Sequence, residues 1–377
     1  MEFKLIIKKL NGTLTPEEAT VFDQWFNESP KHAAYFEKVK VMHDKDVGTI
    51  KQDKAWRTIE RKLERKTKYR IWRYAAAAVF AGIVVSTFLF RKDVQAPLHP
   101  ESQTEVVRSE LKIGTDKAIL TLTDGTEIAL EKGSSQTLGN ATSNGQEIVY
   151  QPTYSEETVP PEFNYLTVPR GGQFSVALSD GTQVWLNSES QLKYPVAFAK
   201  GGTRVVELLY GEAYFEVSPS TENDGAPFKV ATETQEVTVL GTQFNIKAYG
   251  DEETIQTTLV EGKVQVNVGK ESSMLRPKQQ SIVLPGSNKI EVKEVDVYSA
   301  TSWKKGIFSF NDMPLGEIMK VLARWYDIDV VFGDPALKNS SFTGVLRKNQ
   351  HIEVILESIK TTTNMKYEIN KKTVIFK

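Results

Sequence analysis

The sequence offers one pair of carboxylates whose spacing suits acid–base chemistry, Glu212 and Glu216 in the stretch GEAYFEV. On a strand, residues four apart point to the same face, and a pair of carboxylates is the apparatus of glycoside hydrolysis. Like charges at this spacing are more often the solvated edge of a sheet. The pair is therefore weak evidence for a glycan hydrolase, which is the first alternative to a non-catalytic function.

Other residues with catalytic or metal-binding potential are few. The sequence contains no cysteine, and its four histidines, His32, His43, His99 and His351, include no pair at the spacing of metal ligands. A zinc site needs several such ligands close together, and a serine hydrolase needs a histidine base beside its nucleophile. The sequence therefore predicts no metal, no cofactor and no enzyme activity, and it excludes disulfide and thiol chemistry.

An apolar run closed at both ends by positive charge, RYAAAAVFAGIVVSTFLFRK, occupies residues 73–92. Its uncharged part, Tyr74 to Phe90, would reach about 25 Å as a helix, which approaches the thickness of a hydrocarbon core, about 30 Å. A secretory signal peptide would begin close to the N-terminus, and a buried soluble helix rarely lacks polar residues on every face. The run predicts one transmembrane helix over residues 73–92.

Charge is distributed unequally on the two sides of this run. Residues 57–73 contain eight lysines and arginines, whereas residues 91–108 contain three. Because basic residues stay on the cytoplasmic side, the N-terminus is expected in the cytoplasm and the C-terminus in the periplasm. We expect a single-pass protein of the inner membrane whose basic flank contacts anionic lipid rather than nucleic acid.

The segment before the run, residues 1–72, has the pattern of a small cytoplasmic bundle of helices. Thr15 and Pro16 in the stretch TPEE form the cap and first turn of one helix. A bundle of this size buries little surface by itself, so a partner that completes its core is a reasonable hypothesis. Its aromatic residues are candidates either for that core or for contact with the partner; they are Phe22, Trp25, Phe26, Tyr35 and Phe36.

Beyond the run, the pattern changes from helices to strands. Residues 93–112 are polar, contain two prolines and read as a linker,. Residues 113–300 consist of short alternating runs that end in Gly, Pro or Asn, which predicts a β-rich domain. Residues 301–377 change period again and predict a small α+β domain with the order strand, helix, strand, strand, helix, strand, strand.

Within the β-rich domain, one pattern occurs twice. AILTLTDGTEIAL at Ala118–Leu130 and FSVALSDGTQVWL at Phe174–Leu186 both place Asp-Gly-Thr between alternating apolar residues. Asp-Gly between such runs favours a hairpin with a type I′ turn, in which both central residues have positive φ. We therefore expect Gly125 and Gly181 to be the turn glycines of two equivalent hairpins.

The block VPRGGQFSVALSDGTQVWLNSESQLKYP, followed by GEAYFEV and VLGTQFNIKAY, resembles the FecR family of membrane anti-sigma regulators in the form typical of Bacteroidetes. Residues 5–45 resemble the sigma-interacting domain of that family. The stretch GIFSFNDMPLGEIMKVLARWYDIDVVF resembles its C-terminal domain, which is similar to the short N-terminal domain of secretins and TonB-dependent receptors. The resemblance covers nearly the whole chain in the expected order.

This resemblance implies a fold and a set of partners. It implies a cytoplasmic all-α bundle, one transmembrane helix, a periplasmic solenoid- or prism-like β domain and a C-terminal α+β domain. The cytoplasmic part would bind an extracytoplasmic-function sigma factor. The periplasmic part would contact the signalling domain of a TonB-dependent outer-membrane transporter, and site-specific membrane proteases would act on the chain.

The resemblance also implies a site of self-cleavage. In some members of the family, a Gly-Thr bond in the stretch matching VLGTQF breaks spontaneously, and this bond maps onto Gly241 and Thr242. The reaction would be an N–O acyl shift, in which the threonine hydroxyl attacks the preceding carbonyl and the resulting ester is hydrolysed. The alternative is that Gly241 provides a bulge or a close backbone contact in a strand.

A further alternative is an anchored β-module that binds glycan or cell wall and regulates no sigma factor. It would account for the strands and the linker. It gives no reason for a folded segment of roughly fifty residues on the other side of the membrane.

Overall fold

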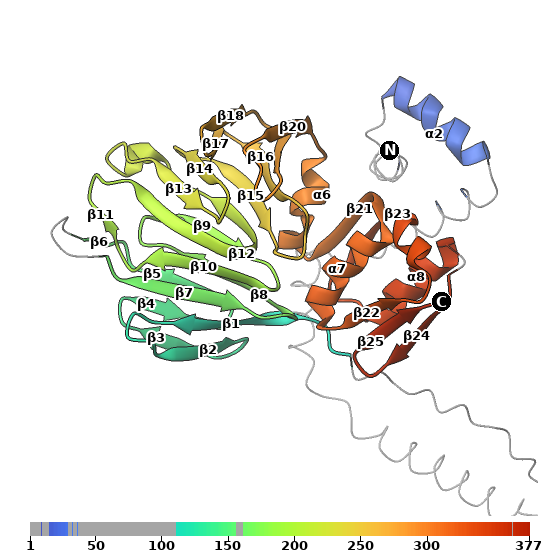
Figure 1. Cartoon of the computed structure of the whole chain (residues 1–377), viewed down its shortest axis with the longest axis horizontal. Coiled ribbons are helices and arrows are strands. Elements are labelled where there is room, and N and C mark those ends of the chain that lie inside the picture. The colour runs from blue at the N-terminus through green and yellow to red at the C-terminus, as the bar shows by residue number, and fades with distance from the viewer. Residues whose placement is uncertain are drawn as a thin grey trace, which may run out of the picture. The chain divides into compact units, whose positions relative to one another are not determined.

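The computed structural model describes residues 9, 15–28, 32, 36, 111–155, 161–363 and 365–377. The chain divides into two compact units, residues 1–103 and 104–377 (Figure 1). The predicted span at residues 73–92 and most of the predicted linker lie outside the described residues. Within the described ranges, no helix is both long and apolar enough to cross a membrane.

In the first unit, the helix α2 (Pro16–Glu28) carries a cluster of aromatic side chains. Phe22 is buried, and its ring centroid lies 5.3 Å from that of Phe36. Trp25 is also buried and stacks on the ring of His32 at 4.8 Å. The aromatic residues of α2 therefore pack against neighbouring rings, and the rest of the predicted bundle lies outside the described residues.

In the second unit, most strands belong to two large sheets that share the long strand β12 (Arg204–Glu216). The first sheet contains, in spatial order, β2 (Glu127–Glu131), β1 (Thr115–Thr121), β7 (Phe163–Val168), β10 (Ser190–Pro195), β12, β13 (Phe228–Ala231), β14 (Glu236–Val239), β17 (Val264–Val268) and β18 (Glu271–Leu275).

The second sheet contains, in spatial order, β3 (Gln136–Leu138), β4 (Ala141–Ser143), β5 (Glu147–Tyr150), β8 (Gly172–Ala177), β9 (Gln183–Leu186), β12, β15 (Gln243–Ala248), β16 (Ile255–Glu261), β19 (Gln279–Val283) and β20 (Ile290–Glu294). A short parallel pairing of β1 with β8 adds a second junction between the sheets. The two-residue strands β6 (Tyr154–Ser155) and β11 (Phe198–Ala199) form a separate small pair.

The two sheets face each other across one apolar core, because alternate residues of each strand point inward. In β7, for example, every second residue is buried, and Leu166 from the first sheet and Phe215 from the second belong to the same core cluster. β12 passes from one sheet to the other at Gly211, whose φ is 100°. A Cβ there would lie 2.2 Å from Ser190 Oγ, so this crossing requires glycine,.

The predicted fold class, with an all-α bundle, a transmembrane helix and a solenoid- or prism-like domain, is wrong. The described residues are mostly strands, and no helix among them qualifies as a membrane span. Successive hairpins alternate between the facing sheets: β8 and β9 lie in the second, β13 and β14 in the first, and β15 and β16 in the second. A solenoid repeat contacts its sequence neighbours alone. Apolar alternation predicts inward faces but not which distant strands pair.

The Asp-Gly-Thr repeats form hairpins, but their turns differ from the predicted type I′. Gly125 and Gly181 both have a φ of 84°, whereas Asp124 and Asp180 keep negative φ. In the first copy, the Gly125 N–H donates to the Leu122 carbonyl at 2.9 Å. This is a type I turn followed by a left-handed glycine, the usual three-residue hairpin loop.

The two copies differ in burial. Asp124 is exposed, and its Oδ1 accepts a hydrogen bond from the Thr126 N–H at 2.9 Å. Asp180 makes the same local contact but is buried, and its Oδ2 lies 2.7 Å from Nη1 of the buried Arg204. The Arg204 guanidinium also donates to two backbone carbonyls, at 3.0 and 2.9 Å. One sequence motif thus serves as a surface turn and as part of an ion pair in the core.

The C-terminal part of the second unit forms a separate α+β structure with its own core. After the short helices α6 (Val297–Thr301) and η2 (Ser302–Lys305), its elements are β21 (Ile307–Pro314), α7 (Leu315–Tyr326), β22 (Asp329–Phe332), η3 (Pro335–Asn339), β23 (Ser341–Arg347), α8 (Ile352–Thr363), β24 (Tyr367–Asn370) and β25 (Thr373–Phe376). β21 pairs with β23, and β25 lies between β22 and β24. Leu111 and Ile113, which precede β1, pack with this core.

The two turns provide a matched test of the buried ion pair. We expect Asp180→Ala to lower the free energy of unfolding by about 3–5 kcal/mol, because it leaves the Arg204 guanidinium buried without its counter-charge. Asp124→Ala removes a hydrogen bond at the surface and should have a much smaller effect. Urea unfolding of both variants measures the difference. Equal losses would show that the Arg204 pair does not stabilise the core.

Candidate functional site

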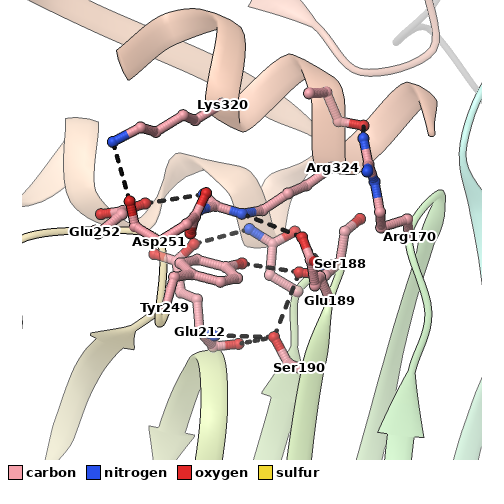
Figure 2. Close-up of polar contacts among 12 residues, drawn as sticks. Arg170, Ser188, Glu189, Ser190, Glu212, Tyr249, Asp251, Glu252, Lys320 and Arg324 are labelled. Carbon is pink, nitrogen blue, oxygen red and sulfur yellow. Dashed lines mark hydrogen bonds and ion pairs between the residues drawn. The ribbon is translucent and has the colours of Figure 1, made fainter. Parts of the chain in front are cut away.

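A cluster of ion pairs and hydrogen bonds lies where the β structure, residues 115–294, meets the C-terminal α+β part, residues 296–377. We call this contact surface the interdomain seam. Polar side chains and backbone groups from the loops at 169–172, 187–190 and 249–252 face α7 there (Figure 2).

Arg324 in the last turn of α7 is the central residue of the seam. Its side chain is buried, its Nη1 lies 2.8 Å from Glu252 Oε1, and its Nη2 binds Asp251. Its Nε lies 3.5 Å from Glu189 Oε2. The guanidinium also stacks over the ring of Tyr249, 3.6 Å from the centroid. The β structure therefore supplies three carboxylates and an aromatic surface to one cation of the α+β part.

A second arginine makes the reciprocal contact. Arg170, in the loop between β7 and β8, donates through Nη2 to the carbonyls of Ala323, at 3.1 Å, and of Ile328. The next residue, Gly171, donates its N–H to the Arg324 carbonyl at 2.7 Å. The last carbonyls of a helix have no partner within the helix and attract cations. The β structure thus caps the C-terminal end of α7.

Glu212 is the centre of a buried hydrogen-bond network beside Arg324. Its two carboxylate oxygens accept hydrogen bonds from the side-chain amides of Asn187, at 2.8 Å, and Asn245, at 2.9 Å. The Trp303 indole N–H donates to Asn245 Oδ1 at 3.1 Å. Burial raises the pKa of Glu212, and the charge of Lys247 and the two amide hydrogen bonds partly offset this rise,.

Lys348, which follows β23, extends this network from the α+β part. Its side chain is 3% exposed, and its Nζ donates to Gln173 Oε1 at 2.9 Å and lies 3.5 Å from Asn187 Oδ1. The ammonium also lies 3.7 Å from the ring centroid of Trp325. Burial lowers the pKa of Lys348 to about 7, although the charges of Glu212 and Asp116 oppose this change,.

The carboxylates considered for hydrolysis, Glu212 and Glu216, share the outer face of β12, since the alternate residues Ala213 and Phe215 point into the core. Each has a structural partner. Glu212 binds the two asparagines, and Glu216 lies 2.5 Å from Lys304 Nζ. Among the described residues, no group of three or more His, Asp or Glu side chains could hold a metal ion.

The proposed cleavage bond lies in the loop before β15. Gly241 has a φ of 150°, and a Cβ there would lie 3.0 Å from Pro219 Cα. The Thr242 hydroxyl, which would be the nucleophile, donates to the Lys263 carbonyl at 3.1 Å. The glycine therefore makes the close backbone contact of the alternative interpretation, and cleavage stays a prediction.

The candidate sigma-binding residues fall into two groups. Phe22 and Trp25 are buried, Phe26 is half-buried, and the Phe26 ring lies 5.5 Å from that of Phe36. Tyr35 lies outside the described residues. Their role in binding stays a prediction.

The seam residues Arg170, Arg324 and Lys348 are not among the candidates predicted from the sequence. Two signals point to the two arginines. The stretch PRGG places a cation before two glycines, which suits a loop in close contact with other backbone. In LARWY, an arginine lies among the apolar residues of an amphipathic helix, where a cation needs a partner.

The fold and the seam define a class: a two-sheet β structure joined through a polar surface to a small α+β part. The family model described as FecR protein matches residues 164–265, and the model described as FecR, C-terminal matches residues 307–376. Arg170, Glu212 and Asp251 lie in the first match, and Arg324 and Lys348 in the second. The seam is therefore the junction between the two family domains.

Two solved structures are also similar, each of a protein assigned as an anti-sigma factor from Parabacteroides distasonis ATCC 8503, at 1.65 and 2.50 Å. They are 30% and 31% identical to this chain with a TM-score of 0.51 each, and the similarity covers 56% and 57% of this chain and 98% of each of those chains. No curated protein matches the sequence. The chain belongs to the FecR family of anti-sigma regulators, as the sequence resemblance predicted.

Arg324 provides a direct test of the seam. We expect Arg324→Ala to destabilise the α+β part by about 1.5–3 kcal/mol, because the guanidinium's hydrogen bonds to Asp251 and Glu252 are lost, although Glu252 keeps its ion pair with Lys247 at 2.6 Å,. Urea unfolding should then show the α+β part unfolding before the β structure. The control is Lys320→Ala, one turn earlier on α7, whose Nζ contacts Glu317 and the Asp251 carbonyl. Similar losses in both variants would contradict a special role for Arg324.

Lys348 should make stability depend on pH. Between pH 7 and its ordinary pKa of 10.5, the unfolded lysine holds a proton that the folded lysine has lost. The free energy of unfolding should therefore rise with pH from 7 to 9, by about 1 kcal/mol per unit from this residue. Lys348→Met should remove this contribution, and Lys289→Met, an exposed control, should keep it. Denaturant unfolding at several pH values measures both slopes, and equal slopes in the two variants would refute the prediction.

Proposed function

We propose that this protein is an anti-sigma regulator that binds an extracytoplasmic-function sigma factor through residues 1–72. The proposal rests on two similarities that agree: one to the models of the family domains and one to solved structures. Both family domains match in order, and two structures of proteins assigned as anti-sigma factors are covered almost completely. The second unit would receive the signal, and its source would be the signalling domain of a TonB-dependent outer-membrane transporter.

The contacts across the seam support a role in which the two family domains of the second unit respond to a partner together. Arg324 and Arg170 tie the two family domains together through contacts made in opposite directions. A partner that binds either domain therefore acts on both. This arrangement suits a receiver that must convert a contact at its surface into a change elsewhere in the chain.

In the first unit, the burial of Phe22 and Trp25 assigns them a supporting role. They would hold α2 against its neighbours, while the more accessible Phe26 would lie nearer the sigma factor. Substitution of a buried aromatic residue removes the fold together with any contact. Phe26 is therefore the better residue for a binding test.

We propose that the protein acts at the inner membrane with its N-terminus in the cytoplasm, because the basic residues at 57–73 outnumber those at 91–108,. Site-specific membrane proteases and self-cleavage at Gly241–Thr242 would belong to the same pathway of signal transfer.

Co-purification tests the sigma-factor partner. The full chain, tagged and cross-linked in its own cells, should recover a sigma factor that mass spectrometry identifies. Phe26→Ala should lower the recovery about fivefold or more, because aromatic residues dominate interface hot spots. Thr20→Ala, exposed on the same helix, should leave it unchanged. Recovery of no sigma factor under several growth conditions would refute the proposal and favour the anchored β-module that binds glycan or cell wall.

A further inference from the structure

A second feature of the seam is an open cavity of about 500 Å³ on the side where β1 begins. Its wall combines the first residues of β1 with residues 305–307 and 347–349 of the α+β part. The cavity is separate from the Arg324 contacts, although Trp325 belongs to both surroundings. The charged residues that line it are Asp116, Lys132, Lys305, Arg347 and Lys348.

The charge of the cavity is not balanced by its own residues. Three lysines, Lys132, Lys305 and Lys348, face one carboxylate, Asp116, and both of its oxygens already accept hydrogen bonds from the side-chain amides of Gln173, at 2.9 Å, and Gln146, at 2.7 Å. In the part of the chain that the structure describes, no carboxylate lies within 4.0 Å of the ammonium groups of Lys132, Lys305 or Lys348. The cavity therefore concentrates positive charge.

Lys348 distinguishes this cavity from a surface with scattered lysines. Its ammonium is buried, and its hydrogen bonds go to neutral amide oxygens. The carboxylates of Glu212 and Asp116 act on this ammonium only from beyond ion-pair distance, and a buried cation is costly without a closer anion,. An anion in the cavity would supply that counter-charge at a position that the seam already fixes.

We propose that this cavity binds a small anion with at least two negative charges, carried by phosphate or carboxylate groups. The volume falls in the range of small-molecule sites. The exposed Lys132 and Lys305 would attract the ligand and bind its outer groups. The buried Lys348 would bind the group that enters deepest.

The lining also links the cavity to the start of the second unit. Ile113, Gly114 and Thr115 form part of its wall. Gly114 packs on the ring of Trp325 so closely that a Cβ would lie 2.6 Å from it. A bound anion would therefore hold the first residues of β1 to the α+β part and stabilise the seam against separation.

Two simple anions test the proposal and distinguish the chemistry of the ligand. Pyrophosphate and malonate, each titrated calorimetrically into the purified full chain at pH 7 and low salt, represent phosphate and carboxylate ligands. Binding of pyrophosphate alone supports a phosphate ligand, and binding of malonate alone supports a carboxylate ligand. Binding of both supports a site for either group. No heat from either probe up to about 10 mM refutes the site, since this limit corresponds to less than about 3 kcal/mol of binding free energy.

Matched charge variants show whether the binding belongs to the cavity. Lys132→Gln with Lys305→Gln should weaken the binding at least tenfold, because each charged hydrogen bond contributes a large part of the affinity. Lys270→Gln with Lys289→Gln removes the same charge from exposed residues outside the cavity and should leave it unchanged. Equal weakening in both pairs would show general electrostatic attraction and refute the site.

Lys348 gives an independent readout. An anion beside it favours the charged form, so binding at pH 8 should take up protons, which calorimetry in two buffers of different ionisation enthalpy detects. Lys348→Met should abolish this proton uptake and weaken the binding at least tenfold. Proton uptake that is unchanged in Lys348→Met would refute the assignment of this lysine to the site.

Discussion

The buried guanidinium of Arg324 is the interaction on which the arrangement of the second unit depends. A charge in this position would be strongly unfavourable without partners, and the β structure supplies Asp251, Glu252 and Glu189 together with the face of Tyr249. The cation thereby fixes which surface of the α+β part meets the β structure. Arg170 makes the reverse contact, because its guanidinium donates hydrogen bonds to carbonyls at the end of α7. Each part therefore supplies partners for polar groups of the other.

The seam differs in kind from the cores on either side of it. The two apolar clusters, one between the facing sheets and one inside the α+β part, share no residue. The seam consists largely of ion pairs, amides and backbone caps. Buried ion pairs contribute little net stability compared with apolar packing, but removal of one partner is costly. Such a contact specifies one orientation strongly, while it holds the two parts together less firmly than a continuous core would.

Sequence reasoning predicted the local elements better than their assembly. The order of elements in the last seventy residues follows from apolar periodicity and from Pro314 before α7,. The pairing of β12 with β9 on one side and β15 on the other could not be derived in this way, because it depends on contacts between distant segments. The same holds for the seam. Arg324 is one arginine in an amphipathic helix until the fold brings Asp251 and Glu252, about seventy residues earlier, to its side.

The segment that leads into β1 is held by Trp325, the neighbour of the seam residue Arg324 on α7. Leu111 and Ile113 are packed in the core of the α+β part, and Gly114 rests on Trp325, the residue after Arg324. β1 then continues into the first sheet of the β structure. A shift of α7 would therefore disturb the ion cluster through Arg324 and the entering chain through Trp325 at the same time.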